Sequence, residues 1–264
     1  MNLTQIFASN NACYKVGTPM KPTGLMLHST GANNPNLKRY VQPDDGLMGN
    51  NPYGNHFNVA YPGGRSVCVH GFIGKLADGS VATRQIMPWT MQAWHSGGSA
   101  NNTHIGVEMC EDDLKDREYF LAVYREAVEL FAYLCKEFNI SPERIVSHKE
   151  GHAMGIAGNH GDPDHWLAKH GKTMDDFRAD VSAQLEEEEM SYDKFKEYML
   201  RYEAERGAKP EAKWSIDEGA FAKAQRKGVM DGTRPEDPIK RCEMAAVMDR
   251  VGLLDSLPDR EDYV

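Results

Sequence analysis

The chain contains no apolar run approaching the roughly 20 residues that a membrane-spanning helix needs, so membrane insertion is not expected. Its first residues, 1–6, have no basic stretch followed by an apolar one, and a standard secretory signal is therefore not expected either. Positive charge is scarce: 30 Lys and Arg stand against 39 Asp and Glu, a formal net charge of −9. A nucleic-acid partner, which needs a basic face, is not expected.

Cysteine is too sparse and too widely spaced to form a structural framework. The chain has 5 cysteines, an odd number, and no CxxC pair occurs. We therefore expect neither a disulfide scaffold nor a cysteine zinc knuckle, but reduced thiols, several of them in the core.

Histidine is missing from the C-terminal part. All 10 histidines lie at or before His170, so any histidine chemistry belongs to the first part of the chain. We predict one domain over residues 1–185 and a small helical module over residues 190–264. The acidic run Glu186–Glu189 between them is typical of a solvated helix end or linker.

Strand-like and helix-like segments alternate in the first domain, which predicts an α/β fold. Short apolar runs indicate buried strands at Gly24–His28, Ile105–Cys110 and Ile145–His148. Apolar side chains at helical spacing predict a helix over residues 117–138, and a second helix is expected to begin after Thr173. Between these elements, residues 31–56 and 149–170 are rich in Gly, Asn, Pro and His, and such long irregular segments tend to carry function.

Three side chains of the first domain are candidates for a metal site. His28 and His148 end predicted strands, and Asp162 lies in a loop. Two imidazoles and a carboxylate leave a fourth position open, as a catalytic zinc site requires, and strand ends converge at one edge of a sheet. The residues alone leave other interpretations open: each histidine could be structural, Asp162 could open a turn, and His148 could pair with His152 on a helix.

Six short motifs then occur in order along the chain. They are Leu25-Met-Leu-His28-Ser-Thr, Asn55-His-Phe57, Trp94-His95, Asn102-Thr-His-Ile-Gly-Val-Glu108, Val146-Ser-His148 and Asp162-Pro163. Together they resemble the zinc N-acetylmuramoyl-L-alanine amidases that are related to peptidoglycan recognition proteins and phage endolysins. The resemblance covers roughly residues 20–185 and implies a central mixed β-sheet flanked by helices, with one Zn²⁺ in a groove.

The resemblance also implies roles for individual residues. His28, His148 and Asp162 would be the zinc ligands, and Glu108 the acidic catalytic group that takes a proton from water and returns it to the leaving amine. Glu108 as a salt-bridged structural residue is the alternative. Asp164 and His165 lie close enough to Asp162 to leave the third ligand open.

The chain departs from the family pattern at two places. His160 stands where the family has a lysine two residues before the third ligand, and an imidazole there could stabilise the oxyanion of the tetrahedral intermediate. Asn55 stands where one branch has a tyrosine, so that role is not carried over. His95 and His104 either line the groove or are structural.

The function implied is hydrolysis of the N-acetylmuramoyl-L-alanine amide bond in bacterial peptidoglycan. We expect a phage or prophage endolysin, made in the cytoplasm and acting on the cell wall after release. A host autolysin, a recognition protein that binds the wall without cutting it, and a zinc peptidase acting within the stem peptide are the alternatives.

The C-terminal part carries a fainter resemblance. Phe221-Ala-Lys-Ala-Gln, Gly228-Val-Met-Asp-Gly-Thr-Arg-Pro235 and the segment from Pro238 to Ala246 resemble one surface-layer-homology repeat. Such repeats are associated with attachment to the cell wall. Because one copy cannot form the usual multi-repeat unit, homodimerisation is the alternative.

Overall fold

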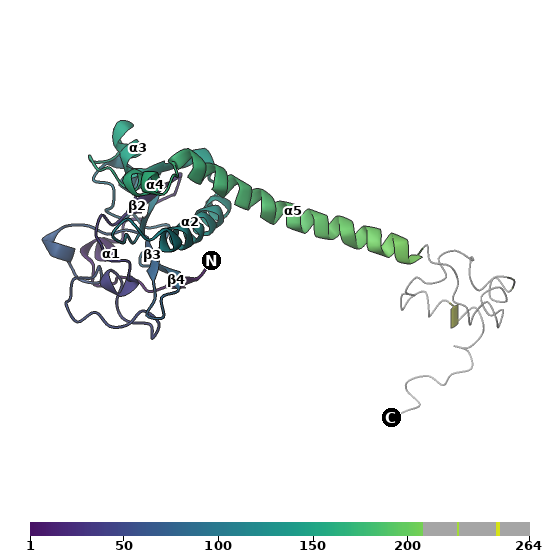
Figure 1. Cartoon of the computed structure of the whole chain (residues 1–264), viewed down its shortest axis with the longest axis horizontal. Coiled ribbons are helices and arrows are strands. Elements are labelled where there is room, and N and C mark those ends of the chain that lie inside the picture. Colours follow the sequence, from purple (N-terminus) through teal and green to yellow (C-terminus); the bar gives the residue numbers. More distant parts are fainter. Residues whose placement is uncertain (208–225, 227–246, 249–264) are drawn as a thin grey trace, which may run out of the picture. The chain divides into compact units, whose positions relative to one another are not determined.

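The computed structural model describes residues 1–207, 226, 247 and 248 (Figure 1). The chain divides into two compact units, Met1–Glu188 and Glu189–Val264. Beyond Gly207, the predicted C-terminal module and its surface-layer-homology-like repeat lie outside the described residues, apart from Arg226, Val247 and Met248. No helix among the described residues is long and apolar enough to cross a membrane.

The first unit is built on one mixed sheet, as predicted. Its six strands lie in the order β1-β4-β3-β5-β2-β6; β3 and β4 pair antiparallel and all other neighbours pair parallel. The strands are β1 (Leu3–Gln5), β2 (Gly24–Ser29), β3 (Gly71–Lys75), β4 (Val81–Gln85), β5 (His104–Met109) and β6 (Ile145–Ser147).

Strands β2 and β5 are neighbouring inner strands of the sheet and are almost continuously buried. Parallel strands covered on both faces read as apolar runs, which is why both were recognisable in the sequence. Their register places His28 directly beside Glu108 near the carboxyl end of the sheet. Side chains alternate between faces along a strand, so Leu25 and Leu27 lie on the opposite face from His28.

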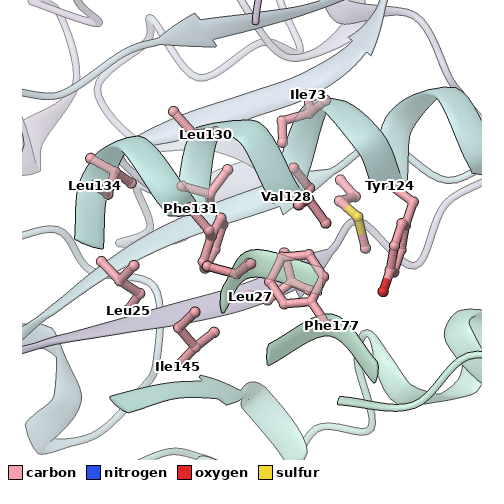
Figure 2. Packing of buried hydrophobic residues seen from close by; sticks show 14 of the residues in the cluster. Leu25, Leu27, Ile73, Tyr124, Val128, Leu130, Phe131, Leu134, Ile145 and Phe177 are labelled. Carbon is pink, nitrogen blue, oxygen red and sulfur yellow. The ribbon is translucent and has the colours of Figure 1, made fainter. Parts of the chain in front are cut away.

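Helix α2 covers one face of the sheet and begins and ends where the pattern predicted, at Arg117 and Phe138. The Asp116 side chain accepts a hydrogen bond from the Tyr119 amide at its start, and Asn139 adopts the left-handed conformation at its end (φ 51°). Figure 2 shows how α2 packs in the core. Leu130, Phe131 and Leu134 lie against residues of the strands and of helix α5, among them Leu25, Leu27, Ile145 and Phe177.

Helix α5 (Met174–Gly207) starts after Thr173, as predicted. The Asp176 amide donates to Thr173 Oγ1 (3.2 Å), and the Thr173 amide donates to Asp176 Oδ2 (2.8 Å). The acidic run 186–189 is not a helix end, because it lies inside this continuous helix, and the boundary between the two units falls within it. Glutamate has good helix propensity, so a run of glutamates does not by itself end a helix.

The remaining helices are short. They are α1 (Ala12–Val16), α3 (His148–Ala153) and α4 (Asp164–Lys169), together with the 3₁₀ turns η1 (Leu37–Arg39), η2 (Pro62–Gly64), η3 (Ser99–Asn102) and η4 (Pro142–Arg144). Residues 31–56 are irregular around η1, as predicted, whereas the segment 149–170, expected to be irregular, contains most of α3 and all of α4. The four cysteines in the described part, Cys13, Cys68, Cys110 and Cys135, are free and buried, as predicted.

Candidate functional site

A cavity of about 470 Å³ opens at the carboxyl ends of β2 and β5, on the sheet face opposite α2. All five residues to which the sequence assigned a role line it: His28, Glu108, His148, His160 and Asp162. They come from two strands, one helix and one loop, and only the fold brings them together.

The three candidate ligands form a tight group. His28 Nδ1 lies 3.1 Å from Asp162 Oδ2 and 3.1 Å from His148 Nδ1, and His148 Nδ1 lies 3.6 Å from Asp162 Oδ1. One ligand atom from each residue lies within 4.8 Å of the others. The neighbouring alternatives to Asp162 point elsewhere: Asp164 pairs with Lys149 (3.8 Å), and His165 pairs with Glu111 (3.0 Å).

The backbone around His148 differs from the predicted strand end. Strand β6 stops at Ser147, and His148 is the first residue of α3. Ser147 and Glu150 form a capping box that starts this helix, a signature present in the sequence as Ser-x-x-Glu. Gly151 lies inside the helix because a Cβ there would come 2.8 Å from the end of the Met26 side chain. The glycine therefore lets α3 lie against β2.

His152 does not join His148 in a helical metal pair. Its side chain is exposed, and its Nδ1 lies 3.4 Å from the Ala157 carbonyl oxygen. Although the two histidines are four residues apart on one helix, only His148 lines the cavity.

Burial and neighbouring charges keep His148 and Asp162 in the forms that bind a cation. Burial, followed by the charge of His28, lowers the pKa of His148 to about 4. Burial works to raise the pKa of Asp162, but the hydrogen bond and charge of His28 and the charge of His148 outweigh it, so this pKa is lowered. At neutral pH the site therefore presents a carboxylate and a neutral imidazole.

These groups fit a zinc ion. When the ring protons of both histidines lie on the nitrogens that face away from the group, the two facing ring nitrogens and the Asp162 carboxylate are all acceptors, and a cation among them satisfies all three at once. Two imidazole nitrogens and one carboxylate oxygen are a common set of protein ligands for catalytic zinc.

Glu108 is the acidic group next to the candidate ligands. Its Oε2 is buried and has no hydrogen-bond partner, and within the described part of the chain no basic side chain pairs with it. Burial, followed by the charges of Asp162 and Glu111, raises its pKa well above the ordinary value. A carboxyl group with such a pKa beside a cavity is suited to take up and release a proton.

His160 lies at the mouth of the cavity. Its side chain is 66% exposed, its ring stacks on that of His148 (4.6 Å between centroids, 21°), and its Nδ1 lies 3.9 Å from Asp162 Oδ1. It is therefore close to the ligands but in contact with solvent.

Two further histidines were left undecided by the sequence. His95 lines the cavity, and burial lowers its pKa well below the ordinary value, so it is neutral at pH 7. His104 is buried next to Gly24 and does not line the cavity, so we interpret it as structural.

Sequence reasoning missed His70 and Glu111. The fully buried His70 accepts a hydrogen bond from the Gly106 amide and donates one to the Met91 carbonyl. His70 ends the apolar run Val67-Cys-Val-His70, the same pattern that identified His28, so the sequence did carry a signal for it. The motif Asn55-His-Phe57, which was identified from the sequence, lies in an irregular segment. Glu111 had no local signal.

Glu111 joins two parts of the site. One of its carboxylate oxygens accepts hydrogen bonds from Ser29 Oγ (2.5 Å) and the Gly31 amide (3.3 Å), just after His28. The same oxygen pairs with His165, three residues after Asp162. This carboxylate therefore ties the end of β2 to the start of α4.

Comparisons with known proteins identify the family. Residues 18–165, more than half of the chain, match the N-acetylmuramoyl-L-alanine amidase family (Amidase_2). N-acetylmuramoyl-L-alanine amidase CwlA of Bacillus sp is 26% identical over 135 residues, covering 50% of this chain and 45% of that protein. A probable N-acetylmuramoyl-L-alanine amidase of Bacillus licheniformis is 37% identical over 87 residues, covering 33% of this chain and 22% of that protein. The chain thus spans less than half the length of these two relatives.

The fold also resembles a solved structure. The crystal structure of Staphylococcus aureus hydrolase AmiA in complex with its ligand matches with a TM-score of 0.50 at 16% identity, covering 70% of this chain and 83% of that one. At this identity the likeness concerns the fold alone. From the match over residues 18–165, the chain belongs to the N-acetylmuramoyl-L-alanine amidase family Amidase_2.

Proposed function

We propose that this chain hydrolyses the N-acetylmuramoyl-L-alanine amide bond of bacterial peptidoglycan and that His28, His148 and Asp162 hold one Zn²⁺ for this reaction. The observation that carries the proposal is the convergence of these three side chains in one cavity, beside the carboxyl group of Glu108, whose Oε2 is buried and unpaired. Family membership supports the bond that is cut.

The chemistry divides between the ion and the chain's own side chains. A bound Zn²⁺ would supply a Lewis acid for the amide carbonyl. Glu108 takes the proton of the attacking water on its carboxylate and returns it to the leaving amine, so the amine departs neutral. The unpaired Oε2 leaves this group free to hold the proton in between.

His160 lies at the mouth of the same cavity. Its exposed ring, stacked on His148, can donate a hydrogen bond to a group that enters the cavity mouth. We propose that it stabilises the oxyanion, the role suggested for the lysine at this place in related amidases.

The presence of both the third ligand and Glu108 favours an enzyme over a recognition protein that only binds wall peptide. On the same basis we propose that the chain acts on the cell wall as an endolysin. Peptidoglycan is the partner proposed.

Digestion of purified walls tests the proposed bond. Mass spectrometry of the released fragments should show free lactyl groups on muramic acid together with new L-alanine amino termini. New termini elsewhere in the stem peptide would instead make the chain a peptidase. Wall binding without any new termini would make it a recognition protein.

Metal analysis tests the proposed ion independently. The purified protein should carry about one zinc, and chelation should abolish cleavage. His28→Ala should lose the metal, because removal of one of three protein ligands weakens the site severely. Full zinc content in His28→Ala would remove His28 from the proposed site.

A further inference from the structure

The ring of His28 has two nitrogens, and both are engaged. Its Nδ1 faces Asp162 and His148, whereas its Nε2 lies 2.9 Å from Nδ1 of His95. The other nitrogen of His95, Nε2, lies 3.0 Å from the carbonyl oxygen of His104. A short row of hydrogen bonds therefore runs from the backbone of β5 through His95 to the candidate ligand.

The direction of these hydrogen bonds follows from the carbonyl at one end. A carbonyl oxygen only accepts, so His95 Nε2 carries the proton and His95 Nδ1, in the neutral ring, is an acceptor. His28 Nε2 must then be the donor, which leaves the lone pair of His28 Nδ1 free. This is the nitrogen that faces the other two candidate ligands.

Contacts with neighbouring strands and loops fix the ring of His95 in one position. Its ring lies directly over Gly106 of β5, where a Cβ would come within 2.4 Å of Nδ1. Its backbone amide donates to Asn101 Oδ1 (3.0 Å), and its ring meets His28 edge-on at 5.1 Å between centroids. The ring of His95 is thus fixed by contacts that are independent of any metal.

Without His95, the ring proton of His28 would be drawn to the other ring nitrogen, Nδ1. Asp162 Oδ2 lies 3.1 Å from His28 Nδ1, at hydrogen-bond distance. A carboxylate is a strong acceptor and would draw the single ring proton to Nδ1, the nitrogen that a metal needs. His95 offers an acceptor at the opposite nitrogen and so shifts the balance between the two tautomers.

We propose that His95 is a positioning residue that keeps the proton of His28 on Nε2, so that Nδ1 is free to bind the metal. The inference rests on the proposed zinc site. It adds a group that does not bind the metal but determines which nitrogen of His28 faces it.

Two substitutions separate the acceptor from the bulk of the ring. His95→Leu removes both hydrogen bonds and keeps an apolar side chain over Gly106. His95→Asn loses the contact with the His104 carbonyl, but its Oδ1 takes nearly the place of Nδ1 and can still accept from His28. If His95 only filled space, Leu would be the better replacement.

Zinc affinity, measured by competition of Zn²⁺ with a chelator of known affinity, is the first readout. His95→Leu should bind zinc about 10- to 100-fold more weakly than the wild type, the usual effect of losing the partner of a ligating histidine. His95→Asn should recover most of that loss. Equal zinc affinity in wild type and His95→Leu, both folded by circular dichroism, would overturn the inference.

The tautomer itself is the second readout and needs no metal. In metal-free protein, nitrogen NMR of the His28 ring should show the proton on Nε2 in the wild type and in His95→Asn, and on Nδ1 in His95→Leu. A proton on Nδ1 in the wild type would overturn the inference even if zinc binds. Conversely, a wild type with the expected tautomer but no affinity for zinc would contradict the proposed function and leave the role of His95 on the tautomer intact.

Discussion

The carboxyl group of Glu108 shows how much a single residue depends on its surroundings. An ordinary glutamate is ionised at neutral pH, but burial and two neighbouring carboxylates raise the pKa of this one. A cation held by the adjacent ligands would act in the opposite sense, because opposite charge favours the ionised form. The same side chain can therefore hold or release a proton within the catalytic cycle.

Substitution of Glu108 by Gln should separate catalysis from metal binding. Gln keeps the shape but cannot accept a proton at neutral pH, so turnover on soluble muropeptides should fall by about 10²–10⁴-fold while zinc content is retained. Glu143→Gln, the same change at an exposed position outside the cavity, is the matched control. A Glu108→Gln rate within a factor of about three of the wild type would make this residue structural.

Buried histidines also make stability depend on pH. Burial is the main cause that lowers the pKa of His70 to about 4, and it lowers that of His104 to about 4 as well, from the 6.5 expected in an unfolded chain. Between these two values the unfolded chain binds protons that the folded chain does not. Stability is therefore present above pH 6.5 and should be lost as pH falls towards 4.

The size of this loss can be checked by urea unfolding in the presence of a chelator. At about 1.4 kcal/mol per pKa unit, His70 alone should withdraw about 3 kcal/mol across this range. His104→Gln should reduce the pH dependence, because it removes one of the two buried histidines. A free energy of unfolding that stays level between about pH 7 and pH 5 would contradict the assignment.

Among the secondary-structure elements, the short helix α3 carries the candidate ligand His148. It has six residues, too few for a stable isolated helix, and its first residue is a candidate ligand. Two devices hold it: the capping box of Ser147 and Glu150, and a fork in which Arg178 of α5 donates two hydrogen bonds to the Glu150 carboxylate, each 3.0 Å. The position of His148 therefore depends on a helix that begins 26 residues later in the chain.

Removal of the cap should weaken both the fold and the metal site. Ser147→Ala deletes the hydrogen bond from the Glu150 amide to Ser147 Oγ (3.0 Å) and should cost about 1 kcal/mol of unfolding free energy. Because His148 follows directly, zinc affinity should fall as well. Ser141→Ala is the control, since Ser141 precedes η4 without a side-chain capping hydrogen bond. Equal loss in both variants would show that the cap has no special role.

For the molecule as a whole, the proposed site lies entirely in the first unit. Every residue given a role is contained in Met1–Glu188, and among the side chains that the structure describes, Leu185 is the last residue of α5 that packs against its core. We propose that the remainder is a separate module that binds the wall or pairs two chains. The effect of such a module would be on local concentration and not on the chemistry.

Truncation after Glu188 tests this division. The shortened chain should fold, bind zinc and cleave soluble muropeptides at the wild-type rate, but act more weakly on intact walls. Sedimentation distinguishes the two roles of the module, because only pairing predicts a dimer that becomes a monomer on truncation. Loss of activity on soluble fragments by a folded truncated chain would mean that the second unit contributes to the active site.

The sequence by itself determined those helices and strands whose residues carry their own apolar pattern. The helix over Arg117–Phe138 carries its own apolar stripe and caps, and β2 and β5 are apolar runs because both their faces are covered. The order of motifs determined the family and the five residues that line the cavity. The Ser-x-x-Glu signature in the sequence also indicates the start of α3. The apolar run before it favoured a strand through His148, and Gly151 argued against a helix.

Only the tertiary structure decided which of ten histidines face one another. The position of Asp162 beside the two histidines, the buried Oε2 of Glu108, and the contacts of His70, His95 and Glu111 all depend on strands and loops far apart in the chain. A side chain's pKa and tautomer are set by what lies within a few ångströms of it, and residue spacing along the chain does not record that distance. The sequence therefore determines the kind of site, whereas the packing of β2, β5 and α3 determines which atoms form it.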